Sequence, residues 1–158
     1  MGDVDPEEIG ITLIHEHTYM LDFDIQLEEL ANFQKQGGTC VVDQTTIGLK
    51  RQPALLRHMA EATGLHVIAS TGFYREERHP KVVGQSDIDE VAQIMVREIE
   101  DAIEGVDFKA GLIGEIGTTE FGTTAQEEKS LRASARAHLA TGVTQRTHYG
   151  WRGSATGN

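Results

Sequence analysis

The sequence of 158 residues predicts an α/β fold built on a parallel sheet, and two regularities of the chain predict it. Five short runs rich in β-branched residues are separated by four stretches that repeat apolar residues at the helical period. Each helical stretch also ends at a glycine, the residue most common just after a helix C-terminus. Strands that alternate with helices form parallel sheets with right-handed crossovers. Two architectures fit this pattern, an open doubly wound sheet and part of a (β/α)8 barrel.

The elements follow one another in a regular order. The expected strands are residues 11–17, 39–43, 66–70, 111–116 and 143–148. The expected helices are residues 25–36, 53–63, 87–104 and 125–141. Pro53 falls in the first turn of the second helix, where proline is tolerated. Ser86 is the expected N-cap of the third helix and Gly105 its end, while Thr124 and Glu127 match a capping box that opens the fourth.

Composition excludes several classes of partner. The net charge is −11, from 14 basic and 25 acidic residues, which argues against binding to nucleic acid or to an anionic membrane. Cys40 is the only cysteine, so neither a disulfide framework nor a cysteine-based zinc site is expected. No apolar run approaches the length of a membrane span or of a signal peptide, and we therefore expect a soluble, cytoplasmic protein.

Two histidines end the first expected strand. Side chains two residues apart share one face of a strand, so Ile11, Leu13, His15 and His17 are expected to point the same way. Two imidazoles held side by side can bind one divalent ion, and imidazole suits zinc and its neighbours. The competing interpretation of this motif is a pair of solvated loop histidines.

Further polar side chains are expected at strand ends, where both architectures place their functional sites. Glu115 shares a strand face with Ile113 and should point inward, where a carboxylate needs a metal or another cation as partner. A structural ion pair is the alternative for Glu115. His148 ends the fifth expected strand, although taken alone it is more typical of a tail histidine. Tyr74 is the expected aromatic wall of a substrate pocket, with a packed core aromatic as the alternative.

The remaining histidines are expected to have no role in the site. His58 and His138 fall inside helices and His66 begins a strand, so we interpret them as structural. His79 precedes a proline in the loop after the third strand and is expected at the surface.

Four stretches resemble the phosphotriesterase family of the amidohydrolase superfamily, and above all its phosphotriesterase-related (homology) proteins and lactonases. They are residues 10–17, 69–74, 109–118 and 137–142. The resemblance implies a TIM-type (β/α)8 barrel with a centre of two divalent metal ions, zinc being the first candidate. It also implies that His15 and His17 bind the more buried ion, that Glu115 bridges both ions, and that His148 binds the second.

The chain also departs from the family pattern. The family has a further metal-binding histidine after strand six and an aspartate after strand eight, whereas this sequence stops at Asn158, after strand five. A complete barrel of this type has about 250 residues. We therefore expect residues 1–158 to form one incomplete barrel domain, truncated after about strand five. Gln145 and Arg146 stand where the family has apolar or small residues.

The function implied by the resemblance is that of a metal-dependent hydrolase. Two ions about 3.5–4 Å apart would share a hydroxide of pKa about 7, which attacks a small ester, lactone or organophosphate. Glu115 is the expected catalytic residue, and the chain alone is expected to be inactive or impaired. The alternative is a non-catalytic half-barrel that binds a partner or self-associates as a homo-oligomer, because Ile11, Leu13 and Ile113 would face solvent without strands six to eight.

Overall fold

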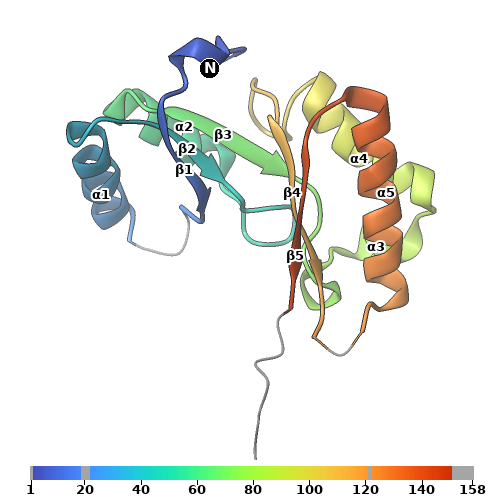
Figure 1. Cartoon of the computed structure of the whole chain (residues 1–158). Helices are drawn as coiled ribbons and strands as arrows, with labels where there is room; N and C mark the ends of the chain where they lie inside the picture. The colour runs from blue at the N-terminus through green and yellow to red at the C-terminus, as the bar shows by residue number, and fades with distance from the viewer. Residues whose placement is uncertain (1, 19–21, 121, 151–158) are drawn as a thin grey trace, which may run out of the picture.

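The computed structural model describes residues 2–18, 22–120 and 122–150, and these form a single parallel sheet flanked by helices (Figure 1). The strands are β1 (Ile11–Glu16), β2 (Gly38–Asp43), β3 (His66–Thr71), β4 (Leu112–Thr118) and β5 (Gln145–Tyr149). The helices are α1 (Phe23–Lys35), α2 (Pro53–Thr63), α3 (Lys81–Gln85), α4 (Ile88–Glu100) and α5 (Ala125–Thr141), with short 3-10 turns η1 (Pro6–Glu8) and η2 (Glu76–Arg78).

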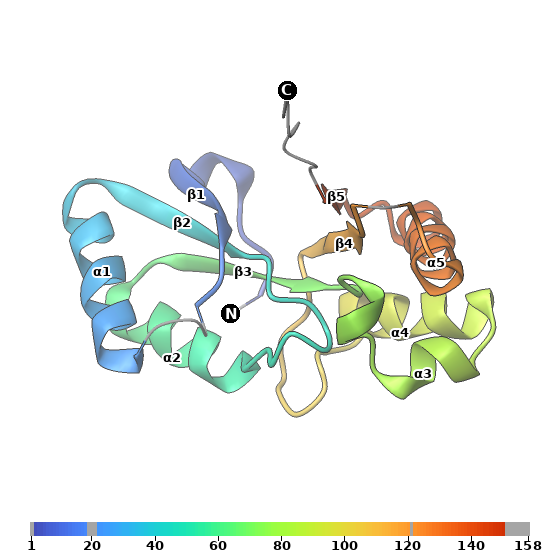
Figure 2. The ribbon, with the colours of Figure 1, turned by 90° about the horizontal axis from the view of Figure 1, so that it is seen from below.

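The five strands lie side by side in chain order, and every neighbouring pair is parallel. Figure 2 shows the helices outside the curve of the strands, with α1 and α2 beside the first strands and α4 and α5 beside the last. The chain therefore forms half of a barrel, and the predicted truncated (β/α)8 architecture is confirmed over the predicted doubly wound sheet. Among the described residues, no helix combines the length and the hydropathy needed to cross a membrane.

Two apolar clusters hold the helices against the sheet. The larger joins β3 and β4 to α4 and α5 and includes Phe73, Met95 and Ile116, each fully buried. The smaller joins β2 to α1 and α2. Cys40 is completely buried, and burial raises the pKa of its thiol, as expected of a small core side chain.

The boundaries of α4 differ from the sequence prediction at both ends. Asp87, not Ser86, caps α4, because its carboxylate accepts from the Glu90 N–H while the Glu90 carboxylate accepts from the Asp87 N–H, both at 2.9 Å. This helix ends at Glu100, and Gly105 lies in a separate turn at φ 83°. Ile103 leaves the helix because it packs at 1% exposure in the core, where its N–H donates to the Phe108 carbonyl. The short helix α3 was not predicted.

The side-chain direction in β4 also corrects the prediction. Ile113 does not face solvent, since it is fully buried in the cluster beneath α4 and α5. Ile116 belongs to the same cluster, although residues three apart on a regular strand face opposite sides. A register shift between Ile113 and Ile116 reverses the alternation, so Ile113 and Glu115 do not share a face. The exposure of Ile11, 63%, agrees with the prediction, but the prediction for Leu13 is wrong, because Leu13 is half-buried and packs against the smaller cluster, before a register shift that separates it from Glu16.

Candidate metal centre

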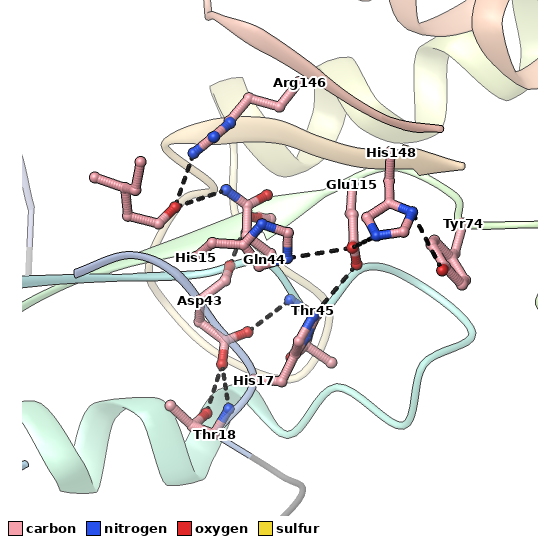
Figure 3. A network of polar contacts seen from close by, with 12 residues as sticks. His15, His17, Thr18, Asp43, Gln44, Thr45, Tyr74, Glu115, Arg146 and His148 are labelled. Atoms are coloured by element: carbon pink, nitrogen blue, oxygen red, sulfur yellow. Dashed lines mark hydrogen bonds and ion pairs between the residues drawn. The ribbon is translucent and has the colours of Figure 1, made fainter. Parts of the chain in front are cut away.

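The structure brings three of the predicted ligands to one point on the inner side of the sheet (Figure 3). His15 is the next-to-last residue of β1, and His17 follows that strand directly. Glu115 comes from β4, which runs on to Thr118, so this residue lies near the middle of its strand. The prediction that it lies at the end of the strand is wrong. The strands of a barrel are staggered, and a mid-strand side chain on one can therefore lie level with the tip of another.

Glu115 is the centre of the cluster. Its Oε1 lies 3.2 Å from His15 Nε2, and its Oε2 lies 3.4 Å from His17 Nε2. The residue is only 5% exposed. Each of His15, His17 and Glu115 offers one ligand atom, and these three atoms lie within 4.8 Å of one another. Among the described residues, no lysine or arginine pairs with the Glu115 carboxylate.

His148 joins the same carboxylate from the last strand. Its Nε2 lies 3.5 Å from Glu115 Oε1, and its ring centroid lies 6.2 Å from that of His15. The fifth strand pairs His148 with Gly117, so the imidazole lies beside the second half of β4. The predicted set of four residues is therefore together in space, and its role in metal binding remains a prediction.

His17 and His148 each have a hydroxyl partner at the ring nitrogen that faces away from Glu115. His17 Nδ1 and Thr45 Oγ1 are hydrogen bonded at 3.2 Å, and His148 Nδ1 and the Tyr74 hydroxyl are hydrogen bonded at 3.4 Å. When the single N–H of a neutral imidazole is on Nδ1, its Nε2 turns a lone pair toward the Glu115 carboxylate. Two such lone-pair groups repel unless a cation lies between them. Imidazole nitrogen and carboxylate oxygen are the donors of zinc sites, so these residues fit a divalent ion.

Tyr74 lies against His148, and its hydroxyl contacts the ring of this histidine. The ring centroids of Tyr74 and His148 are 5.3 Å apart, and the Arg75 guanidinium lies over the Tyr74 ring, 5.2 Å from its centroid. Gly117 permits this approach, because a Cβ there would lie 2.7 Å from the Tyr74 ring. Contact between Tyr74 and a substrate remains a prediction.

Sequence reasoning missed the polar residues at the C-terminal end of β2. Asp43 ends the strand, Gln44 and Thr45 follow it, and all three are 1–2% exposed and lie around the cluster. Their position at the end of a strand was the available signal. Arg146, noted as a departure from the family, donates to the Ile14 carbonyl at 2.8 Å and so links β5 to β1. Gln44 Nε2 donates to the same carbonyl at 3.2 Å.

His79 supports the Tyr74 segment and is half-buried, whereas it was predicted at the surface. Its Nε2 donates to the Tyr74 carbonyl at 2.8 Å, and its ring lies edge-on to Phe73. Burial lowers the pKa of His79 below its ordinary value, against the opposing effects of the bond to Tyr74 and of the nearby Glu127 and Glu76 carboxylates. Its Nδ1 is buried and has no hydrogen-bond partner among the described residues.

We expect His79 to make the fold sensitive to mild acid. With a folded pKa below the unfolded value of 6.5, the contribution is fully present above pH 6.5 and is lost as the pH falls through the folded pKa. The free energy of unfolding, measured by urea titration between pH 7.5 and 5, should fall less in His79→Gln than in the parent chain. His138→Gln, an exposed site, is the control. If the free energy of unfolding fell equally in His79→Gln and in the parent between pH 7.5 and 5, this assignment would be contradicted.

The half-barrel with histidines and a glutamate on its inner side defines the class of protein, that of the (β/α)8 barrels with a polar site inside the barrel mouth. The particular family follows from the sequence comparison. The model of the phosphotriesterase family matches residues 1–156, and the chain belongs to this family.

Individual relatives agree with this assignment. The chain is 38% identical over 124 residues to a phosphotriesterase-related protein of Nematostella vectensis, covering 78% of this chain and 35% of the relative. It is 35% identical to the phosphotriesterase homology protein of Escherichia coli, covering 88% and 52%. It is 30% identical to an N-acetyltaurine hydrolase of Tetraodon nigroviridis, covering 95% and 55%. The chain thus spans about half, or less, of the length of these relatives.

Solved structures show the same likeness. The Escherichia coli phosphotriesterase homology protein, solved with phosphate in its active site, matches with a TM-score of 0.85 and 33% identity, over 90% of this chain and 53% of that one. A lactonase from Listeria monocytogenes matches with a TM-score of 0.87 and 25% identity, over 94% and 55%.

Proposed function

We propose that this chain carries the first part of the active site of a metal-dependent hydrolase, in which His15, His17 and Glu115 hold a divalent ion, with zinc as the first candidate. The observation that carries the proposal is the buried Glu115 carboxylate, which faces the Nε2 atoms of His15 and His17 without a permanently charged partner among the described residues. A buried carboxylate in this setting is costly unless a cation joins it.

The chain's own residues have distinct roles in this proposal. Glu115 supplies negative charge and presents Oε1 to His15 and His148 and Oε2 to His17, so its two oxygens can serve two ions. His148 is proposed to hold the second ion, oriented by the Tyr74 hydroxyl on its Nδ1. When bound, a divalent ion supplies Lewis-acid chemistry, which polarises a carbonyl or phosphoryl oxygen and acidifies water.

The proposed substrate is a small molecule with an ester, lactone or organophosphate group. The named lactonases among the structural relatives support a carbonyl substrate. The N-acetyltaurine hydrolases among the sequence relatives add a small amide to the classes that should be assayed. All of these substrates present a polarisable oxygen beside the atom that is attacked, and such an oxygen is what a site of this composition can bind.

Metal content tests the proposal directly. After equilibration of the purified chain with zinc, manganese or cobalt and removal of excess ion, elemental analysis should find about one ion or more per chain. The variant His15→Ala/His17→Ala should retain less than about a tenth of this amount, because two of the proposed ligands are gone.

The matched control is His58→Ala, which removes an exposed histidine from α2. Its metal content should equal that of the parent chain. Equal metal content in the double variant and the parent would contradict the assignment of His15 and His17, and the absence of bound metal in the parent would contradict the proposed function itself.

A further inference from the structure

Asp43 is the most deeply buried acidic side chain beside the candidate centre that is not itself one of the proposed ligands. It is the last residue of β2 and is 1% exposed. A buried carboxylate needs several hydrogen-bond donors to offset the loss of its hydration. The residues that donate hydrogen bonds to Asp43 therefore indicate its role.

Among the described residues, the three donors to the Asp43 carboxylate belong to Thr18, which follows His17, and to Thr45, which contacts its ring. Thr18 donates twice to Oδ2, through its backbone N–H at 2.9 Å and its hydroxyl at 2.6 Å. The backbone N–H of Thr45 donates to Oδ1 at 2.9 Å. Figure 3 shows the carboxylate between these two threonines, with His17 beside them. One side chain therefore fixes both the residue that follows His17 and a residue that contacts its ring.

Thr45 completes the link to the imidazole. Its hydroxyl is hydrogen bonded to His17 Nδ1 at 3.2 Å, on the side of the ring opposite to the Nε2 that faces Glu115. An imidazole that coordinates through Nε2 must carry its hydrogen on Nδ1, and Thr45 Oγ1 is placed to accept it.

His17 lies directly after the last residue of β1. The strand ends at Glu16, which pairs with Asp43, and its register with β2 is already shifted between Leu13 and Glu16. The last ladder contact here is the Gln44 N–H, which donates to the Glu16 carbonyl at 2.8 Å. His17 thus lies just beyond the regular sheet, and the hydrogen bond with the Thr45 hydroxyl contributes to its orientation.

We propose that Asp43 is a positioning residue for the metal centre, which orients His17 by holding Thr18 and Thr45 on either side of it. The inference rests on the proposed function, because it concerns how well His17 can serve as a ligand. Residues that orient a metal-binding histidine typically contribute 10–100-fold to metal affinity. Asp43 acts through its neighbours, and no contact of its own with an ion or a substrate is required.

Metal affinity in matched variants tests the proposal. Zinc dissociation constants, measured on the whole chain by competition with a chromophoric chelator, should rise about 10–100-fold in Asp43→Asn. Thr45→Val, which preserves shape but removes the hydroxyl, should weaken zinc about 10-fold, and Thr45→Ser should restore the parent affinity. In the zinc-loaded chain, the His17 Nδ1–H proton should exchange with water more slowly in the parent and in Thr45→Ser than in Thr45→Val.

Ser70→Ala is the matched control. The buried Ser70 hydroxyl donates to the backbone carbonyl of Asp43 at 2.6 Å, so this variant disturbs the same residue without changing the carboxylate or its threonines. We expect Ser70→Ala to bind zinc with the same affinity as the parent chain. Equal loss in Ser70→Ala and Asp43→Asn would show that Asp43 is only part of the scaffold, and it would overturn the proposal.

The result also separates this inference from the proposed function. If the parent chain binds zinc and His17→Ala weakens it, but Thr45→Val and Asp43→Asn bind as the parent does, the positioning role is wrong while the metal centre stands. If the parent binds no zinc, the proposed function fails, and the inference that rests on it fails too. Thr45→Val keeps the test decisive even if Asp43→Asn does not fold.

Discussion

Replacing Glu115 with glutamine is expected to weaken zinc binding by more than about 100-fold, because the change removes the only negative charge among the proposed ligands His15, His17, Glu115 and His148. Glutamine has nearly the same shape, so the three histidines keep their neighbour. The loss would therefore report charge and coordination, and not a collapse of the site.

The same variant should behave in the opposite way without metal. A carboxylate that is 5% exposed and whose ion-pair partners among the described residues are all histidines costs free energy in the folded state, so the metal-free Glu115→Gln chain should be as stable as the parent or more stable. Zinc at 100 times the dissociation constant of the parent should stabilise the parent by about 2.7 kcal/mol and the variant by no more than about 0.4 kcal/mol. Urea unfolding with and without zinc measures both effects.

Glu98→Gln is the control for loss of a buried carboxylate outside the site. Glu98 forms a bidentate ion pair with Arg51, with the closer contact at 2.6 Å and both side chains 9% exposed. Removing one partner of a buried ion pair costs about 3–5 kcal/mol, so Glu98→Gln should be less stable than the parent without metal. Zinc should nevertheless stabilise Glu98→Gln by as much as it stabilises the parent. A metal-free Glu115→Gln chain destabilised like Glu98→Gln would contradict a metal role for Glu115 and favour a structural one.

Features with strong local signals were predictable from the sequence. The capping box of α5 is present, and α2 and α5 both end at glycines in the left-handed region, Gly64 at φ 73° and Gly142 at φ 74°. Such signals depend only on neighbours in the chain. The order of strands and helices followed from them, and with it the parallel sheet.

The direction of Glu115 was predicted correctly for a wrong reason. Strict alternation would place it on the same side as Ile113, which in fact packs under the helices. The register shift in β4 depends on how β5 pairs with it, from Gln145 opposite Ile113 to Thr147 opposite Ile116, and no local pattern encodes that pairing. The position of Glu115 within its strand was missed for the same reason.

Elements held by distant residues were not predictable at all. The C-terminal end of α3 is satisfied by Lys129 of α5, whose Nζ donates to the carbonyls of Val83 and Ser86 at 2.8 and 2.7 Å. The link from Asp43 to His17 also depends on a long-range contact, because the Asp43 carboxylate accepts a hydrogen bond from Thr18, 25 positions away in the chain. Contacts of this kind appear only once the sheet has brought the segments together.

Glu127 is expected to be the most important single side chain for the stability of this half of the barrel. It is fully buried at the start of α5, and its carboxylate accepts hydrogen bonds from the backbone N–H groups of Thr124 and Thr119, both at 3.1 Å, and of Glu76 at 3.3 Å. Thr119 follows β4 and Glu76 follows β3, in the segment that also carries Tyr74. One carboxylate thus ties a helix N-terminus to the loops after two strands of the site.

The ionisation of Glu127 gives this prediction a pH dependence. Burial alone would raise the pKa of the carboxyl group, but the hydrogen bonds from Thr124, Thr119 and Glu76 outweigh it and hold the pKa below the ordinary value of 4.5. Because the folded pKa is the lower one, the stabilisation is present above about pH 4.5 and is lost as the pH falls through the folded pKa. The parent chain should therefore lose stability below pH 4.5 more steeply than a variant without this carboxylate.

Glu127→Ala should lower the free energy of unfolding by about 3–5 kcal/mol at pH 7, since it leaves several buried N–H groups without an acceptor. A loss of this size is a large part of the 5–15 kcal/mol typical of a domain. Urea unfolding at pH 7 and pH 4 measures the loss and its pH dependence. The adjacent Glu128→Ala is the control, because Glu128 only pairs with Arg132 on the surface of α5, a contact of about 0.3–0.5 kcal/mol. Similar losses of unfolding free energy in the two variants would show that the buried carboxylate does not hold these loops together. The same conclusion would follow if the stability of Glu127→Ala fell with acid as steeply as that of the parent.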